Sequence, residues 1–317
     1  MIKTMLLMVI VLVGSAAWGA PSYPPATVEV PIEQVAAHSY YALGAAGMAT
    51  ENEGFISNAG FVVTDAGVVV FDSLGSPSLA WALREKIRGI TDKPVLKVIV
   101  SHYHADHIYG LQVFQDEGAE ILAPRGAYEY LESITAAERL DERRFSLDPW
   151  VNDDTRLVRP DRLIEDEYRF SLGGVDFQVN YLGSAHSEGD MTLYVVQDRV
   201  LYSGDIIFEG RVPFVGDADT KRWLETLESL ETSELVALVP GHGPAAADPV
   251  GAVARTREYL AYLRDVMGAA VDDFQDFASA YAQADWGRFE QLPAFEAANR
   301  RNAYQVFLSM EAEALGQ

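Results

Sequence analysis

One short stretch of the sequence holds three of the six histidines in the chain, together with an aspartate. These side chains are His102, His104, Asp106 and His107, within six consecutive positions directly after an apolar run. That density of metal-competent groups is far above what a surface acquires by chance. Imidazole and carboxylate groups ligate zinc and other divalent ions of similar chemistry. The spacing therefore predicts a metal site.

Three further potential ligands come directly after predicted strands. His186 follows the predicted strand at 175–181, Asp205 follows the one at 199–202, and His242 follows the one at 235–239. Side chains at strand ends lie on loops that a rigid sheet holds in place, so residues distant in sequence can meet there. We therefore expect these three to join the cluster. The remaining histidine, His38, has no predicted role.

The apolar pattern also predicts the elements that position these groups. The expected elements are a hairpin of strands at 61–63 and 68–71, a helix through Leu79, Leu83 and Ile87, a strand at 95–100 that leads into the cluster, a strand at 191–196, a helix with Asp219 or Thr220 as its N-cap, and helices from 253 to 310. The short turn at 65–67 joins the two hairpin strands.

Composition narrows the class of protein. Of the 317 residues 49% are hydrophobic, enough for one large core. The chain has no cysteine, so disulfides and thiolate metal ligands are excluded. Its formal net charge of -23 argues against binding to nucleic acid or to anionic membranes, because both would repel the protein. We expect a small-molecule substrate; the sequence leaves the oligomeric state open.

The N-terminus has the pattern of a secretory signal. Lys3 is followed by the apolar run 5–13 and by small residues up to Ala20. An uncleaved anchor is the alternative, but the run is shorter than the roughly 20 residues that a spanning helix needs. The predicted organisation is a signal peptide at 1–19, a catalytic domain at 20–249 and a helical extension packed on it at 250–317. The mature protein is expected to be secreted, in the periplasm, without a membrane anchor.

Four motifs in order carry a resemblance to a known family. They are His102-Tyr-His-Ala-Asp-His107, His186-Ser-Glu-Gly-Asp190, Gly204-Asp205 and Gly241-His-Gly243. From about Asn58 to Pro244 the sequence resembles the metallo-β-lactamase superfamily. The resemblance implies an α/β fold, a four-layered αββα sandwich, to which the C-terminal helical extension would be added. It also implies two Zn²⁺ ions, with other divalent metals as the alternative.

The resemblance further implies a division of the ligands between two ions. The first ion would take His102, His104 and His186, the second Asp106, His107 and His242, and Asp205 would bridge both. Asp72 and Asp190 match positions where a carboxylate orients a ligand or its loop. For these two residues a plain loop or cap role is the alternative. A metal site that only braces the fold is disfavoured, because such sites are normally closed by four ligands.

The expected reaction is hydrolysis of a carbonyl substrate. Two ions roughly 3.5–4 Å apart can share a bridging hydroxide that attacks a thioester, ester, lactone or β-lactam-like amide. Asp106 would orient this nucleophile or take a proton, and Tyr109 is a candidate oxyanion donor. Asp205 stands where lactamases that hydrolyse antibiotics usually carry cysteine or serine, so the site is more similar to the glyoxalase II-like, lactonase and general hydrolase branches.

Two other functions remain open at this stage. The run 204–219 resembles secreted zinc metallohydrolases associated with sulfur oxidation and quinoprotein relays, so a non-catalytic periplasmic accessory of a redox system is one alternative. In that run Arg211 could meet a substrate carboxylate and Phe208 or Phe214 could wall the pocket, or the loop could simply pack. The other alternative is a mononuclear iron enzyme similar to persulfide dioxygenase.

Overall fold

Two β-sheets lie face to face in the computed structural model, which describes residues 23–316. The first sheet has the order β1-β2-β3-β4-β5-β6-β7 and the second β12-β11-β10-β9-β8. Strands of the first sheet are β1 (Ile32–Gln34), β2 (Ser39–Ala42), β3 (Ala59–Val63), β4 (Val68–Phe71), β5 (Val95–Ile99), β6 (Glu120–Pro124) and β7 (Arg162–Ile164). Strands of the second are β8 (Tyr168–Leu172), β9 (Val175–Gly183), β10 (Asp190–Val195), β11 (Val200–Phe208) and β12 (Ala237–His242).

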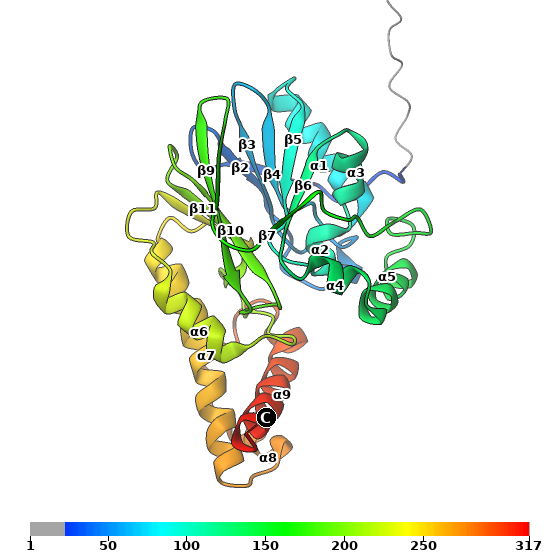
Figure 1. Cartoon of the computed structure of the whole chain (residues 1–317). Coiled ribbons are helices and arrows are strands. Elements are labelled where there is room, and N and C mark those ends of the chain that lie inside the picture. The colour runs from blue at the N-terminus through cyan, green and yellow to red at the C-terminus, as the bar shows by residue number, and fades with distance from the viewer. Residues whose placement is uncertain (1–22, 317) are drawn as a thin grey trace, which may run out of the picture.

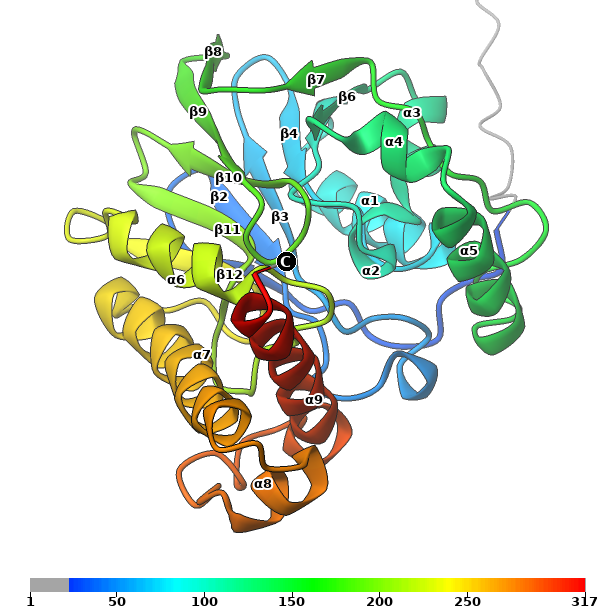
Figure 2. The ribbon, with the colours of Figure 1, turned by 60° about the horizontal axis from the view of Figure 1, so that its bottom comes forward.

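Helices cover the outer faces of both sheets (Figures 1 and 2). On the side of the first sheet lie α1 (Pro77–Ile90), α2 (Ala105–Ile108), α3 (Leu111–Asp116), α4 (Ala127–Leu131) and α5 (Ile134–Ser146). On the side of the second lie α6 (Thr220–Ser229), α7 (Pro249–Asp272), α8 (Phe277–Gln283) and α9 (Phe295–Ala314). The predicted αββα sandwich and the helical extension are confirmed.

Alternating burial explains how the sheets meet. In β9, Val175, Phe177 and Val179 are buried in the core between the sheets, whereas Asp176 is exposed. This is the period of two expected of a strand with one buried face. β4 is buried on both faces, because its other face lies under the helices of the first sheet. The predicted hairpin is also present, since β3 and β4 pair antiparallel.

The predicted start of α6 is confirmed at Asp219. This carboxylate accepts a hydrogen bond from the backbone N–H of Arg222 at 3.0 Å, which satisfies one of the free donors of the first turn. Trp223 and Leu227 then face the core. The indole N–H of Trp223 donates to the carbonyl of Ile206 in β11 at 3.0 Å. The helix is thereby fixed to the strand that carries Asp205.

The C-terminal extension holds the segment 210–217 that follows β11. Asn302 on α9 is fully buried, and its amide accepts from the N–H of Val215 at 3.0 Å and donates to the carbonyl of Pro213 at 2.7 Å. The same amide donates to the hydroxyl of Tyr259 on α7 at 2.8 Å. Helices α7 and α9 pack against each other beside the sandwich (Figure 1). The extension therefore shapes a loop close to the predicted site.

Three sequence predictions need correction or lie outside the described residues. Asp205 and His242 do not follow their strands but lie inside them, because β11 continues to Phe208 after a register shift at Gly204 and β12 continues to His242. Gly204 has φ +53°, a conformation that favours glycine. The predicted signal peptide lies outside the described residues. Within residues 23–316, no helix combines the length and the apolar character needed to cross a membrane.

Candidate metal centre

The structure brings all seven predicted ligands together. The cluster lies between β5 and the end of α2, His186 lies in the turn between β9 and β10, and Asp205 and His242 lie in the neighbouring strands β11 and β12. Two groups form in which ligand atoms lie within 4.8 Å of one another. The first group is His102, His104, His186 and Asp205, and the second is Asp106, His107 and His242.

Asp205 faces both groups. Its Oδ2 lies 3.3 Å from Nε2 of His186 in the first group and 3.2 Å from Nε2 of His242 in the second. Its Oδ1 lies 3.2 Å from Nε2 of His107. The Asp205 side chain is 3% exposed, so these short contacts occur away from bulk water. Asp205 therefore has the position that a ligand shared by two ions requires.

A hydrogen-bond network behind the first strand fixes the rings of His102 and His107. Asp72, at the end of β4, accepts from the N–H of Ser101, from its hydroxyl and from Nδ1 of His107, all at 2.7–2.8 Å. The Ser101 hydroxyl is used as a donor to Asp72, so it accepts from Nδ1 of His102 at 2.9 Å. Both rings thus carry a proton on Nδ1 and turn Nε2 toward the centre.

His242 is oriented in the same way by the backbone. Its Nδ1 donates to the carbonyl of Ile56 at 2.6 Å, which leaves Nε2 as an acceptor. Nε2 faces Oδ2 of Asp106 at 3.4 Å as well as Asp205. Imidazole nitrogens and carboxylate oxygens therefore converge, and Nδ1 of His104 lies 2.9 and 3.0 Å from Nε2 of His102 and of His186. The carboxylates of Asp106 and Asp205 repel each other unless a cation lies among them.

Buried atoms without partners show that the residues fit a metal. Nε2 of His107 and Oδ1 of Asp205 are buried and lie 3.2 Å apart without a hydrogen bond of good geometry, and Nδ1 of His186 is buried without a partner. Buried polar groups are otherwise nearly always paired, because a lone one costs desolvation energy. Nitrogen and oxygen donors without sulfur are the ligand set of zinc and related divalent ions. The donor chemistry and the unpaired atoms both fit such ions.

The pKa values of the cluster shift in opposite directions. Burial lowers the pKa of His186 to about 3, because the imidazolium form loses its hydration. Burial also acts to lower the pKa of His107, but Asp205, Asp106 and Asp72 outweigh it and raise that pKa well above its usual range. The pKa of Asp205 lies well below its usual range, because the surrounding histidines outweigh burial. The carboxylates of Asp205 and Asp106 therefore attract positive charge to the part of the cluster around His107.

Asp190 shapes the turn that carries His186. Its buried carboxylate accepts from the backbone N–H groups of Ala185 and Ser187 at 3.1 and 2.9 Å, and from the Ser187 hydroxyl at 2.9 Å. Burial raises its pKa to about 7 despite these hydrogen bonds. Asp190 therefore acts on the loop and not on the imidazole, whereas Asp72 contacts the His107 ring directly.

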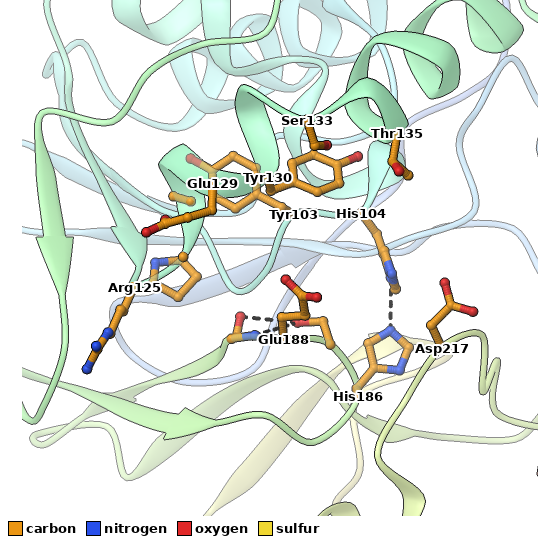
Figure 3. A pocket seen from close by; sticks show the side chains of 15 residues that line it. Tyr103, His104, Arg125, Glu129, Tyr130, Ser133, Thr135, His186, Glu188 and Asp217 are labelled. Carbon is orange, nitrogen blue, oxygen red and sulfur yellow. Dashed lines mark hydrogen bonds between the residues drawn. The ribbon is translucent and has the colours of Figure 1, made fainter. Parts of the chain in front are cut away.

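A cavity of about 350 Å³ opens beside the first group (Figure 3). His104 and His186 form one end of it, with Nδ1 of His104 3.0 Å from Nε2 of His186. The other labelled side chains of the wall are Tyr103, Arg125, Glu129, Tyr130, Ser133, Thr135, Glu188 and Asp217. The rings of Tyr103 and Tyr130 lie 5.7 Å apart and make an apolar side opposite Glu188. A substrate in this cavity would reach the first group of ligands.

Comparison with known proteins decides the family. The sequence profile of the metallo-beta-lactamase superfamily matches residues 52–242, which is more than half of the chain. The chain belongs to this superfamily. It is 26% identical over 200 residues to a metallo-beta-lactamase type 2 from Elizabethkingia meningoseptica, covering 59% of this chain and 69% of that relative. It is 22% identical over 235 residues to a linear primary-alkylsulfatase from Pseudomonas, covering 63% of this chain and 44% of the relative.

Solved structures of the superfamily share the fold. A sec-alkylsulfatase from Pseudomonas has a TM-score of 0.68 at 20% identity, and the match covers 88% of this chain and 50% of that one. A metallo-beta-lactamase from Pontibacter korlensis has a TM-score of 0.59 at 20% identity, covering 74% and 99%. The chain thus spans about half of the alkylsulfatases that it matches.

In this member of the superfamily, Tyr109 does not line the cavity. Its side chain is 1% exposed in the core under the first sheet, and its buried hydroxyl has no hydrogen-bond partner. Tyr109 follows His107 by two residues at the end of α2, and residues two apart on a helix point to different sides. His107 faces the metal centre and Tyr109 faces the core. The position gives no support to the predicted role of Tyr109 as an oxyanion donor.

Several residues near the centre were not predicted. Ser101 connects Asp72 to His102, but a serine before the cluster carries no signal by itself. The residues of α4, of α5 and of the segment after β11 that line the cavity match no sequence motif and were not predicted either. The two phenylalanines singled out in the sequence do contact ligand rings: Phe208, at the end of β11, stacks on His242 with ring centroids 5.0 Å apart, and the ring centroid of Phe214 lies 6.2 Å from that of His104.

Proposed function

We propose that this superfamily member is a secreted, periplasmic, dinuclear zinc hydrolase that acts on a carbonyl substrate. The observation that carries the proposal is the position of Asp205, whose two carboxylate oxygens face both groups of ligands at 3.2–3.3 Å. A shared carboxylate between two adjacent groups is what two ions acting together need. The substrate classes remain thioester, ester, lactone and β-lactam-like amide.

The proposed ligands follow the two groups. His102, His104 and His186 would hold one ion and Asp106, His107 and His242 the other, with Asp205 on both. When bound, such ions supply Lewis acidity to the substrate oxygen and acidify water near neutral pH. Asp72 keeps the Nδ1 proton of His107 in place, and the Ile56 carbonyl does the same for His242.

Asp106 is the proposed proton acceptor. Its side chain is 21% exposed, whereas those of His107 and Asp205 are almost fully buried. The pKa of Asp106 is lowered, because His107 and His242 outweigh the effect of burial, so the carboxylate is ionised at neutral pH. It can therefore orient a water molecule or take its proton. The backbone carbonyl of Asp106 accepts from the Ser57 hydroxyl at 2.5 Å, which fixes the loop.

The relatives support hydrolysis but not one substrate. One is named a metallo-beta-lactamase and another an alkylsulfatase, so related sequences act on chemically different compounds. The likeness of residues 204–219 to secreted metallohydrolases of sulfur-oxidation systems stays a prediction. The aspartate at position 205 favours the glyoxalase II-like and lactonase reactions over antibiotic hydrolysis.

The test is hydrolysis of a panel of thioesters, lactones, esters and β-lactams by the zinc-loaded full chain. The proposal predicts turnover of at least one class, lost in Asp106→Asn and kept in Asp153→Asn, a matched change at an exposed carboxylate. If protein with a full complement of metal hydrolyses none of these classes, the proposed function changes from a hydrolase to a non-catalytic accessory protein. Equal activity of Asp106→Asn and the native chain would refute the role of Asp106.

One observation favours a second candidate, a mononuclear iron enzyme. The first group alone, His102, His104, His186 and Asp205, forms a complete set of four ligands. Against it, the second group is equally well oriented, by Asp72 and by the Ile56 carbonyl. One iron per chain with thiol-dependent oxygen uptake would establish the second candidate.

A further inference from the structure

A second cavity of about 210 Å³ lies behind the metal centre. It is formed by Phe208 at the end of β11 and the segment 210–213 that follows, by residues 255–259 of α7 and by residues 288–292 between α8 and α9. None of the seven predicted ligands lines it. The ring of Phe208 belongs to its wall and stacks on His242 with an interplanar angle of 4°. One aromatic ring thus separates this cavity from the metal centre.

Three guanidinium groups face the cavity, and only two of them have carboxylate partners. Arg255 pairs with Glu209 at 2.8 Å, and Arg288 pairs with Glu258 at 2.6 Å. Both of these arginines are about half exposed, so they stand at the mouth. Among the described residues, no carboxylate forms an ion pair with the third, Arg211.

Arg211 is a partly buried cation that forms no ion pair with a carboxylate of residues 23–316. Its Nη1 is buried without any hydrogen-bond partner, and its Nε makes only a long contact of 3.5 Å with the Val212 carbonyl. Burial lowers the pKa of the guanidinium, and the carboxylates of Asp205 and Asp106 oppose this only in part. A buried charge without a partner is costly, so such a group favours an anion from outside the chain.

Apart from Thr256 and Glu258, which is paired with Arg288, the remaining wall is mostly apolar and defines the rest of the ligand. Phe208, Pro213, Tyr259, Phe289 and Leu292 line the cavity between the arginines. The volume lies below the roughly 300 Å³ at which pockets for drug-sized ligands begin, so the occupant is small. A fully hydrated inorganic anion would leave these side chains without contacts. One uncompensated guanidinium matches one negative charge.

We propose that this cavity is a binding site for a small organic monoanion, a carboxylate on an apolar body, with Arg211 as its counter-ion. The site goes beyond the proposed hydrolysis, because it shares no lining residue with the cavity at His104 and His186 that is proposed to hold the substrate. The ligand is held by residues that the C-terminal extension brings to β11. Its binding is expected to be independent of metal.

Calorimetric titration of the full chain with benzoate, and with benzamide as the uncharged analogue of the same shape, tests the proposal. Benzoate is expected to bind both the zinc-loaded chain and the chain after chelation, and benzamide at least about tenfold more weakly, because the charge-assisted hydrogen bond is missing. Arg211→Gln should weaken benzoate binding about tenfold or more. Arg125→Gln, an exposed guanidinium at the other cavity, should leave it unchanged.

A second variant tests the location without changing charge. Leu292→Trp fills the cavity from the partly exposed segment between α8 and α9, and it should abolish benzoate binding in a chain whose circular dichroism is unchanged. Absence of benzoate binding to the native chain would overturn the proposal. The proposal would also be overturned if benzamide bound as tightly as benzoate, or if Arg211→Gln bound benzoate as tightly as the native chain. Loss of benzoate binding on chelation would overturn it as well, because the anion would then be bound to the metal ions.

Discussion

Replacement of Asp72 by asparagine tests whether the network behind the cluster holds a metal ligand. The Asp72 carboxylate is 1% exposed and accepts three hydrogen bonds, two from Ser101 and one from Nδ1 of His107. An amide keeps one acceptor for the Ser101 N–H and presents its own N–H groups to the other donors. Nδ1 of His107 then loses its acceptor, and the proton moves to Nε2, the atom that faces Asp205.

The expected cost appears in metal affinity. Removing the hydrogen-bond partner of a metal-ligating histidine weakens binding by roughly 10–100-fold, which corresponds to about 1.4–2.8 kcal/mol. The ion held by the second group should be affected most, because Asp72 contacts His107 directly and reaches His102 of the first group only through the Ser101 hydroxyl. Competition of the protein with a chromophoric zinc chelator should therefore show one strongly weakened site and one site weakened less.

Asp198→Asn is the matched control. Asp198 is also buried and accepts three hydrogen bonds, from the N–H and Nδ1 of His38 and from the Ser39 hydroxyl, but it lies away from the centre. Both variants should lose about 1–3 kcal/mol of unfolding free energy. Only Asp72→Asn should lose zinc affinity. Two unchanged zinc affinities in Asp72→Asn would refute the argument that this carboxylate sets the tautomer of His107.

Three other predictions concern stability, the loop and the backbone. Burial acts to raise the pKa of Asp198, but hydrogen bonds from His38 and Ser39 outweigh it and lower that pKa. The ionised carboxylate therefore stabilises the fold above the unfolded pKa near 3.9, and this stabilisation is lost as the pH falls through the lower folded pKa. In urea unfolding, the difference in unfolding free energy between the native chain and Asp198→Asn should shrink in acid. Asn302→Ala should speed hydrogen exchange of the Val215 amide about tenfold or more, and an unchanged rate would show that the extension does not hold this loop. In Gly241→Ala the new Cβ would overlap Oδ1 of Asp205, which is the ligand proposed for both ions. The content of both metal ions, measured by mass spectrometry, should therefore fall in a chain that still folds. Full metal content would contradict the close approach of β11 and β12 at this point.

The ligands could be predicted from sequence because each follows a strong apolar run. The strands that carry Asp205 and His242 are almost entirely buried, so their hydrophobic pattern is clear. The continuation of β11 past Asp205 could not be predicted, because it depends on pairing with β12 after the bulge at Gly204. Strand edges and bulges are set by tertiary pairing and not by local preference.

The strands β7 and β8, at the edges of the two sheets, could not be predicted because their sequence patterns are weak. The strand β7 has three residues, and β8 alternates between exposed and partly exposed residues, so neither shows a buried face in the sequence. The second cavity was hidden for another reason. Arg211, Arg255 and Arg288 come from three segments far apart in the chain, and only the packing of α7 and α9 brings them to one cavity.

Metal stoichiometry of the purified full chain tests the central claim most directly. Two divalent ions per chain are expected from the two groups of ligands, as measured by mass spectrometry after dialysis against zinc. His242→Ala should retain one ion, because it removes a ligand of the second group and leaves the first complete. A single ion in the native chain, with no change in His242→Ala, would contradict a dinuclear centre.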